Sequence, residues 1–314
     1  MSQMPAFTVL DHQGMLSVRG VDAAKFLQGQ LTCNLNYVSH DRSTLGARCT
    51  PKGRMQSSFR LAMQGDGFLL SMARELVERQ LGDLKKFAVF SKSVLKDESA
   101  DWLQLGLINA EAVLQELGIE LPADSGSLVQ HNGLLAIRIG DALAELWIPA
   151  ADGGCTLRNL AARIEEKPAN DWQLAMIRCG LGHVTANSYE SFIPQMLNLP
   201  ALDGVSFKKG CYTGQEIVAR MQYLGKQKRH MLRFIAQGDY EIPATGTALL
   251  QADDGSKAGE VVNAARSPDG IELLAVVQTD IASEHPLVLD MAGRPPLITA
   301  NLPYEIDVER EIQR

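Results

Sequence analysis

One cysteine in this 314-residue chain stands in surroundings that favour a reactive thiol. Cys211 directly follows Lys208, Lys209 and a glycine, and a helix is predicted to begin a few residues after it. The positive end of a helix macrodipole and nearby ammonium groups both favour a thiolate over a thiol. We therefore predict that Cys211 is a functional thiol. The alternative is a half-buried cysteine that fills space beside the helix.

The helix itself is predicted from the residues after the cysteine. Thr213 and Glu216 have the spacing of a capping box, in which the hydroxyl and the carboxylate each accept from a free backbone N–H group. The pattern predicts a helix over residues 214–224, which Gly225 can end in a left-handed conformation.

The other cysteines and the histidines give no sign of a metal site or a disulfide framework. The five cysteines are widely spaced and form no C-x-x-C pair, and the six histidines form no H-E-x-x-H motif. The N-terminus lacks the pattern of a signal peptide, and charged residues interrupt the apolar stretch 134–150. We therefore expect a cytoplasmic protein with reduced thiols, no metal ligands and no membrane span.

Basic residues are concentrated around the cysteine. Between residues 208 and 233 a single acid, Glu216, accompanies seven basic residues, so this segment carries +6 and leaves −13 for the rest of a chain of net charge −7. Such a segment suits an anion, for example a phosphate, a polyglutamate tail or an RNA backbone, although a solvated face is the usual role of a charge run. The chain has no RNP, KH or zinc-knuckle pattern, which argues against direct tRNA binding. The seven are Lys208, Lys209, Arg220, Lys226, Lys228, Arg229 and Arg233.

The elements that must position these residues alternate between strands and helices, which predicts an α+β fold. We expect an N-terminal hairpin, an amphipathic helix over 74–90 and a long ordered loop over 185–207. Short segments between Gly and Pro turns beyond residue 237 predict a small β-barrel. The remaining predicted elements are the hairpin strands 7–10 and 15–18; strands 44–49, 55–63, 68–72, 93–96, 103–108, 134–139, 142–148 and 229–236; and helices 22–28, 111–117, 156–164 and 172–179.

Four motifs resemble those of the YgfZ family, which are bacterial folate-binding relatives of the glycine-cleavage T protein. They occur in the family's order along nearly the whole chain: F-L-Q-G-Q-L-T at 26–32, P-K-G-R at 51–54, F-I-P-Q at 192–195 and K-G-C-Y-T-G-Q-E at 209–216. The resemblance implies three domains around a central channel that holds tetrahydrofolate or a derivative, the last domain being a β-barrel. The implied boundaries are 1–48 plus 168–236, an inserted domain at 49–167, and the barrel at 237–314.

The resemblance also implies roles for individual residues. Cys211 matches the family's required cysteine, and Trp172 matches a tryptophan associated with folate, although core packing is the commoner role of such a residue. A second family tryptophan falls on Gln13 here, so the details of pterin stacking differ. The rest of the signature consists of Lys209, Gly210, Tyr212, Gly214, Gln215, Glu216 and Arg220.

Two functions follow from the resemblance. In the first, the protein binds folate and maintains iron–sulfur enzymes, among them those of tRNA methylthiolation; its partners are such enzymes or assembly proteins, and it acts as a monomer. In the second, it is a folate-dependent one-carbon transferase of the aminomethyl type. A transferase needs a positioned general acid or base, and the sequence identifies no carboxylate for that role, so whether the protein is an enzyme stays open.

Overall fold

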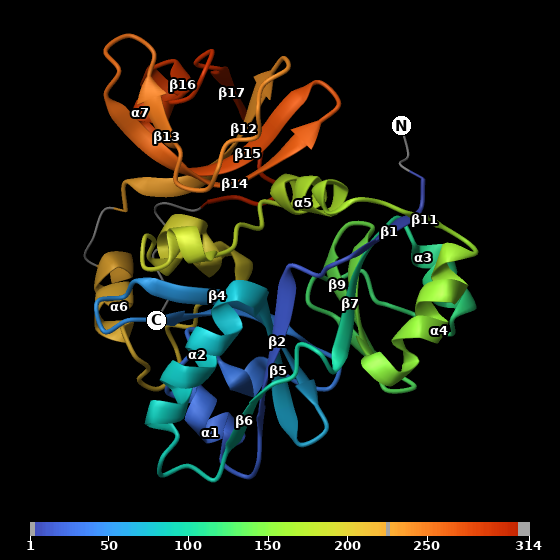
Figure 1. Ribbon diagram of the computed structural model, residues 1–314. Coiled ribbons are helices and arrows are strands. Elements are labelled where there is room, and N and C mark those ends of the chain that lie inside the picture. Colours follow the sequence, from blue (N-terminus) through green and yellow to red (C-terminus); the bar gives the residue numbers. More distant parts are fainter. Residues whose placement is uncertain (1–3, 224–226, 307–314) are drawn as a thin grey trace. The chain divides into compact units, whose positions relative to one another are not determined.

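β-Sheets organise the chain in the computed structural model, which describes residues 4–223 and 227–306 (Figure 1). A six-stranded sheet has the order β11-β1-β7-β10-β9-β8, and a five-stranded sheet has the order β3-β4-β5-β2-β6. The other strands close into the barrel β12-β15-β14-β13-β16-β17. The predicted α+β class and the C-terminal barrel are thus confirmed.

The bounds of these strands follow the chain as β1 Ala6–Val9, β2 Gln13–Arg19, β3 Thr44–Cys49, β4 Met55–Gln64, β5 Gly67–Ala73, β6 Val94–Asp97, β7 Trp102–Ile108, β8 Leu128–His131, β9 Leu134–Gly140, β10 Leu143–Pro149, β11 Glu165–Glu166, β12 Arg229–Gln237, β13 Ala248–Gln251, β14 Lys257–Ser267, β15 Gly270–Gln278, β16 Leu287–Leu289 and β17 Pro296–Ala300. The helices are α1 Ala23–Gln28, α2 Arg74–Phe87, α3 Glu111–Glu116, α4 Ala150–Ala161, α5 Ala169–Arg178, α6 Gln215–Tyr223 and α7 Thr279–Glu284. Four 3₁₀ helices are η1 Leu35–Tyr37, η2 Ala186–Ser188, η3 Pro194–Leu197 and η4 Leu199–Leu202.

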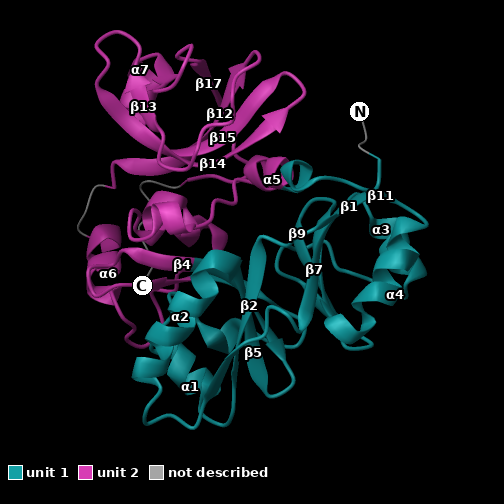
Figure 2. Cartoon of the chain, viewed as in Figure 1, with its two compact units in different colours: residues 1–46, 58–172 teal, residues 47–57, 173–314 magenta. Residues whose placement is uncertain are grey.

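The chain divides into two compact units (Figure 2). Unit 1 comprises residues 1–46 and 58–172, and unit 2 comprises residues 47–57 and 173–314. Strands β3 and β4 therefore each run from one unit into the other. The barrel begins with β12, so the predicted barrel boundary at residue 237 falls on the last residue of that strand. The three-domain division stays a prediction. No helix within the described ranges is long and apolar enough to span a bilayer.

The predicted N-terminal hairpin is wrong. Strand β1 pairs with β7, where Phe7 lies opposite Leu107, whereas β2 pairs with β5 and β6 of the other sheet. The turn between them does form, because the Gln13 amide donates to the Leu10 carbonyl at 3.0 Å. Both strands bury apolar residues, and they do so in different cores. Each strand therefore joins the sheet whose core buries its side chains, instead of pairing with the other strand.

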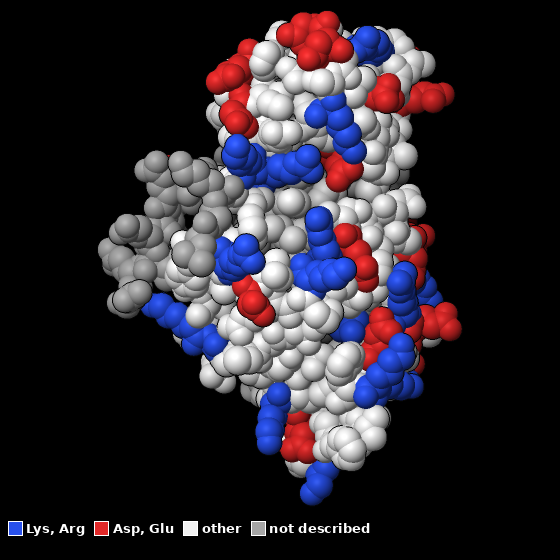
Figure 3. Space-filling model, turned by 90° about the vertical axis from the view of Figure 1, so that its left-hand side faces the viewer, with Lys and Arg blue, Asp and Glu red and all other residues white. Residues whose placement is uncertain are grey.

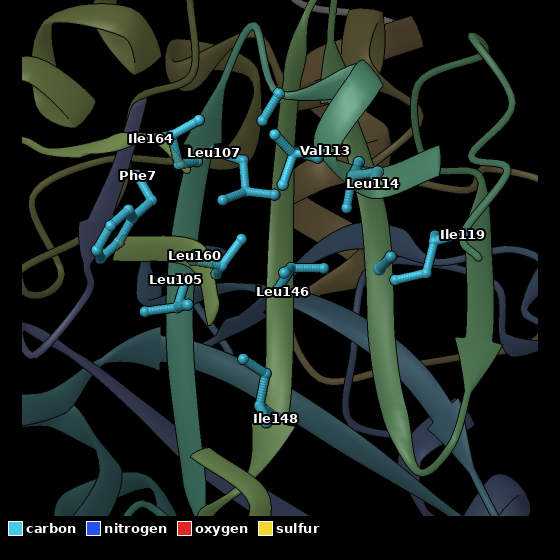
Figure 4. Packing of buried hydrophobic residues seen from close by; sticks show 13 residues of the cluster. Phe7, Leu105, Leu107, Val113, Leu114, Ile119, Leu146, Ile148, Leu160 and Ile164 are labelled. Carbon is cyan, nitrogen blue, oxygen red and sulfur yellow. The ribbon is translucent and has the colours of Figure 1, made fainter. Parts of the chain in front are cut away.

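The core of the six-stranded sheet lies between one sheet face and two helices (Figure 4). Phe7, Leu105 and Leu146 of the sheet pack there with residues of α3 and with Leu160 of α4. Helix α4 begins six residues before the predicted start at 156 and includes two glycines. A Cβ atom on Gly153 would lie 3.2 Å from the Leu103 side chain, so this glycine lets α4 approach the sheet closely.

A buried ion fork fixes α5 to the barrel within unit 2. Arg178 of α5 donates to Glu272 of β15 from Nε at 3.0 Å and from Nη2 at 2.5 Å, and Arg233 of β12 donates to it at 3.1 and 2.7 Å. Burial of the Glu272 carboxyl opposes its ionisation, but hydrogen bonds from the two guanidinium groups outweigh that effect and hold its pKa below its ordinary value of 4.5. The ionised carboxylate therefore stabilises the fold.

We predict that Glu272→Gln lowers the stability of unit 2 at pH 7 by about 2 kcal/mol, because it removes the charge that both arginines share. Folding lowers the pKa of the Glu272 carboxyl, so the ionised group stabilises the folded protein at any pH above its unfolded-state pKa. This stabilisation is lost as the pH falls from that value through the lower pKa of the folded state. The difference in thermal midpoint between the wild type and Glu272→Gln should therefore shrink as the pH falls below 4.5. Glu260→Gln, which removes a surface pair with Lys257, is the matched control. A pH-independent difference would contradict the prediction.

Candidate functional site around Cys211

Three of the four sequence motifs meet within unit 2. The P-K-G-R motif forms the turn between β3 and β4, in which the Gly53 amide donates to the Thr50 carbonyl and the Thr50 amide donates to the Arg54 carbonyl, both at 2.8 Å. Residues 47–57 belong to this unit although both flanking segments belong to unit 1. The turn is thus part of the structure that holds the cysteine motif.

The F-I-P-Q motif is bonded to the strand that leaves this turn. The Met55 amide donates to the Phe192 carbonyl at 2.8 Å, and the Glu190 amide donates to the Met55 carbonyl at 2.9 Å. The side chain of Gln56 also donates from Nε2 to the Glu190 carboxylate at 2.9 Å. The long loop predicted over 185–207 is therefore ordered along β4, and it contains η2, η3 and η4.

Two buried amide side chains anchor the same loop to later elements. Gln195 donates from Nε2 to the Val218 carbonyl of α6 at 2.6 Å, and Asn198 donates from Nδ2 to the Met231 carbonyl of β12 at 2.8 Å. A buried hydrogen bond is costly to lose, because its donor would be left unsatisfied. The loop consequently fixes the position of α6.

Gly214 brings the cysteine motif against the P-K-G-R turn. Its φ is +86°, and a Cβ atom there would lie only 2.4 Å from the Thr50 carbonyl oxygen and 3.1 Å from the Cys49 Cβ atom. On the opposite side of the contact, a Cβ atom on Gly53 would lie 3.1 Å from Ile217 of α6. Only glycine satisfies both the left-handed backbone and the close approach at residue 214.

The predicted capping box is displaced. Helix α6 begins at Gln215, and the Val218 amide donates to the Gly214 carbonyl, so Gly214 and not Thr213 occupies the cap position. Within the described residues, Thr213 and Glu216 make no reciprocal side-chain bonds. The error arose because the Thr50 contact requires a positive φ at residue 214, which moves the helix start by one residue. Gly225, predicted to end the helix, lies outside the described residues.

Cys211 itself is exposed, while the residue after it is buried. The Tyr212 ring is held inside the motif, and the Lys209 ammonium lies 5.0 Å from its centroid, within range of a cation–π interaction. By contrast, Cys49 is buried in the adjoining strand, where loss of solvent raises the pKa of its thiol to about 12 although Arg48 opposes the shift. Of these two thiols, only that of Cys211 is accessible from solution.

The other predicted ligand residues lie in unit 1. Trp172 is 1% exposed, and a Cβ atom on Gly106 of β7 would lie 2.4 Å from its ring, so the indole packs flat against that glycine. Gln13 is the first residue of β2 and pairs with Ala73. Trp172 is therefore a packing residue in this structure, and contact of Trp172 or Gln13 with folate stays a prediction.

Sequence reasoning missed a buried polar layer beside Trp172. Thr8 and Glu145 both lie opposite Gly106 in the register of β1, β7 and β10, so they share with Trp172 the sheet face that is opposite the apolar core. The Thr8 hydroxyl is buried without a hydrogen-bond partner in the described structure, and the Glu145 carboxylate accepts from Trp147 Nε1 at 2.9 Å. This face thus has unused hydrogen-bonding capacity.

Arg60 of β4 adds a positive charge to the same layer. Burial lowers the pKa of the Arg60 guanidinium and raises the pKa of the Glu145 carboxyl, and the opposite charge of each partly offsets the shift of the other. Arg60 has a single, long hydrogen bond in the described structure, to Ser43 Oγ at 3.5 Å. The signal in the sequence was Glu145 in an apolar strand, which was treated only as a charge that interrupts the stretch 134–150. Arg60 was not singled out.

The sequence is similar to curated proteins over almost its whole length. It is 33% identical over 304 residues to the tRNA-modifying protein YgfZ of Yersinia pseudotuberculosis serotype IB (strain PB1/+), covering 95% of this chain and 92% of the relative. It is 32% identical over 308 residues to the tRNA-modifying protein YgfZ of Pectobacterium carotovorum subsp. carotovorum (strain PC1), covering 96% and 92%. The chain belongs to the YgfZ family. No protein-family model matches it.

The fold of this YgfZ-family chain resembles that of a solved transferase. The glycine cleavage system aminomethyltransferase T from Bartonella henselae superimposes with a TM-score of 0.74 at 15% sequence identity, covering 95% of this chain and 85% of that protein. The predicted T-protein-like fold is thereby confirmed.

The basic residues of the segment 208–233 differ in their surroundings. Arg233 is engaged by Glu272, and Lys226 lies outside the described residues, whereas Lys208, Arg220 and Lys228 are exposed. Figure 3 shows a face on which Lys and Arg side chains are interspersed with Asp and Glu instead of forming a continuous stripe. No group of three or more His, Cys, Asp or Glu residues in the described ranges has the geometry to hold a metal ion.

We predict that Gly214→Ala destabilises the protein by at least about 2 kcal/mol, because the substitution combines an unfavourable left-handed backbone with a clash against the Thr50 carbonyl. Gly210→Ala is the matched control in the same motif, because a Cβ atom there meets nothing within 4 Å and should change stability by less than about 0.5 kcal/mol. Thermal unfolding measures both variants. Equal midpoints for the two would contradict the packing described for Gly214.

Proposed function

We propose that this protein binds a folate and maintains iron–sulfur enzymes of tRNA modification, with Cys211 as its key thiol. The observation that carries the proposal is an exposed cysteine in a motif that two other motifs hold in place. The relatives are named tRNA-modifying proteins, which supports tRNA modification as the process that the protein serves. We further propose that the protein acts as a cytoplasmic monomer and does not bind tRNA directly.

The geometry around the cysteine suits contact with a large partner. Glycine precedes Cys211 and the buried Tyr212 follows it, so the thiol is offered outward from a fixed backbone instead of facing a closed pocket. Thiolate sulfur is the usual protein ligand of iron in iron–sulfur clusters. Lys208 and Lys209 next to it can balance the negative charge of a thiolate or of a thiolate-bound cluster. Contact with a cluster, with a cluster-bearing partner or with a one-carbon adduct is compatible with this arrangement.

The polar layer in unit 1 has the chemistry to hold a folate. A pterin ring presents amino and ring N–H groups that a carboxylate can accept from, together with acceptor atoms that suit a hydroxyl or a guanidinium donor. Glu145 and Thr8 supply such groups on the sheet face that Trp172 covers, and Arg60 interacts electrostatically with Glu145. All three have unused hydrogen-bonding capacity. When bound, tetrahydrofolate supplies nitrogen atoms that carry one-carbon units.

The alternative function, a folate-dependent one-carbon transferase, rests on the aminomethyltransferase-like fold. Steady turnover of a methylene or aminomethyl donor by the purified protein would favour this alternative over the maintenance function.

We predict that Cys211→Ala leaves the thermal midpoint unchanged within 1–2 °C or so, because the side chain is exposed, but abolishes rescue of methylthiolated tRNA in a deletion strain. Cys155→Ala replaces the other exposed cysteine and should rescue fully. Nucleoside analysis of total tRNA measures both. Full rescue by Cys211→Ala would refute the proposed role of the thiol.

We predict that tetrahydrofolate changes the tryptophan fluorescence of the protein and that Glu145→Gln weakens its binding roughly tenfold, the effect of about 1.4 kcal/mol. Glu116→Gln, which alters an exposed surface pair on α3, should bind as the wild type does. Fluorescence titration and calorimetry provide the measurements. If neither detects binding to the wild type, both folate functions fail.

A further inference from the structure

Unit 1 exposes a group of large apolar side chains on two neighbouring loops. The group comprises the end of α2, the connection from α2 to β6, and the turn before α1 (Figure 1). We call these five residues the Phe90 patch, with exposed fractions of 86% for Val21, 56% for Phe87, 72% for Val89, 101% for Phe90 and 70% for Val94. An isolated exposed apolar residue is ordinary, but five of them on neighbouring segments favour an interaction site.

The two loops are held together by the backbone. A Cβ atom on Gly20 would lie 2.4 Å from the Lys92 carbonyl oxygen, and the Lys92 amide donates to the Asp22 carboxylate at 2.8 Å. Within the connection, the Ser91 and Ser93 hydroxyl groups share a hydrogen bond of 2.7 Å. The patch is therefore a preformed surface, which reduces the ordering cost of binding.

Lysines surround the patch. Lys25, Lys85, Lys86 and Lys92 are all exposed, and only Lys86 has an ion-pair partner among the described residues, Asp83 at 2.8 Å. Three ammonium groups are thus left for a partner, in a protein whose net charge is −7. An apolar centre with a charged rim is the usual anatomy of a protein interface. The charge of the rim requires carboxylates on the opposite side.

We propose that the Phe90 patch is a docking surface for an acidic protein, in which the Phe90 ring enters an apolar pocket bordered by carboxylates. Resting on the proposed function, the partner is the iron–sulfur enzyme that this protein maintains. Fully exposed aromatic side chains are typical anchors of such interfaces, and lysine rims raise the association rate.

The composition of the patch disfavours the other anionic partners. Three of its five residues are valines, which offer bases no aromatic face to stack on, so single-stranded RNA is a poor match. The same two elements, α2 and β6, also carry the exposed carboxylates of Glu78 and Asp97, which an anionic bilayer would repel. A protein surface can accommodate both signs of charge.

The test uses the full-length protein and a purified iron–sulfur tRNA methylthiolation enzyme as the probe. Phe90→Ser and Val89→Ser should each weaken the complex at least tenfold in biolayer interferometry, while their thermal midpoints and tetrahydrofolate titrations match the wild type. Lys85→Gln with Lys92→Gln should reduce the salt dependence of binding. Ile242→Ser replaces another exposed apolar residue, outside the patch, and should bind normally.

The outcomes separate this inference from the function on which it rests. Binding unaffected by the Phe90 and Val89 substitutions, or no binding by the wild type, overturns the inference. The inference is also overturned if the Phe90 and Val89 substitutions weaken binding to tRNA or to phosphatidylglycerol vesicles but not to the enzyme. If Phe90→Ser restores tRNA methylthiolation fully and Cys211→Ala does not, the docking surface fails while the proposed function stands. Full restoration by Cys211→Ala instead refutes the role of the thiol in the proposed function.

Discussion

The close approach of Gly214 to the carbonyl oxygen of Thr50 is the contact on which the candidate site depends. No side chain can stand between the two backbones, so the turn of one motif lies directly against the helix start of another. The buried bond from Gln195 to the Val218 carbonyl fixes α6 from a third segment. The position of α6, and with it the end of the loop that carries Cys211, is thus set by residues that carry no reactive group.

The buried carboxylates Glu272 and Glu145 differ in how well they are satisfied. Glu272 receives hydrogen bonds from two guanidinium groups, and an ionised carboxylate that is fully bonded in this way serves stability. Arg60 and Glu145 share a buried layer with few bonds, which is expensive unless something completes them. This contrast is the physical reason for associating the first with the architecture and the second with a ligand.

Local patterns located most helices and strands, because hydrophobic periodicity and turn residues act over short stretches. Strand pairing could not be predicted in the same way. Strands β1 and β2 are neighbours in sequence, yet they belong to different sheets, because Phe7 and Met15 are buried in different cores. The start of α6 was misplaced by one residue because Thr50, far away in sequence, dictates the backbone at Gly214. Trp172 could be recognised as important, but its burial against Gly106 depends on a contact that no local pattern encodes.

The division of the chain also has a consequence for biosynthesis. Residues 47–57 leave the ribosome early, but the segments that they bind, around Phe192 and Gly214, follow the whole of 58–172. At about 5–20 residues per second, the β3–β4 turn waits several seconds or more for its partners. Unit 1 can therefore begin to fold while this turn is still unpaired, and the thiol of Cys211 becomes part of an ordered surface only after about two thirds of the 314 residues have been made.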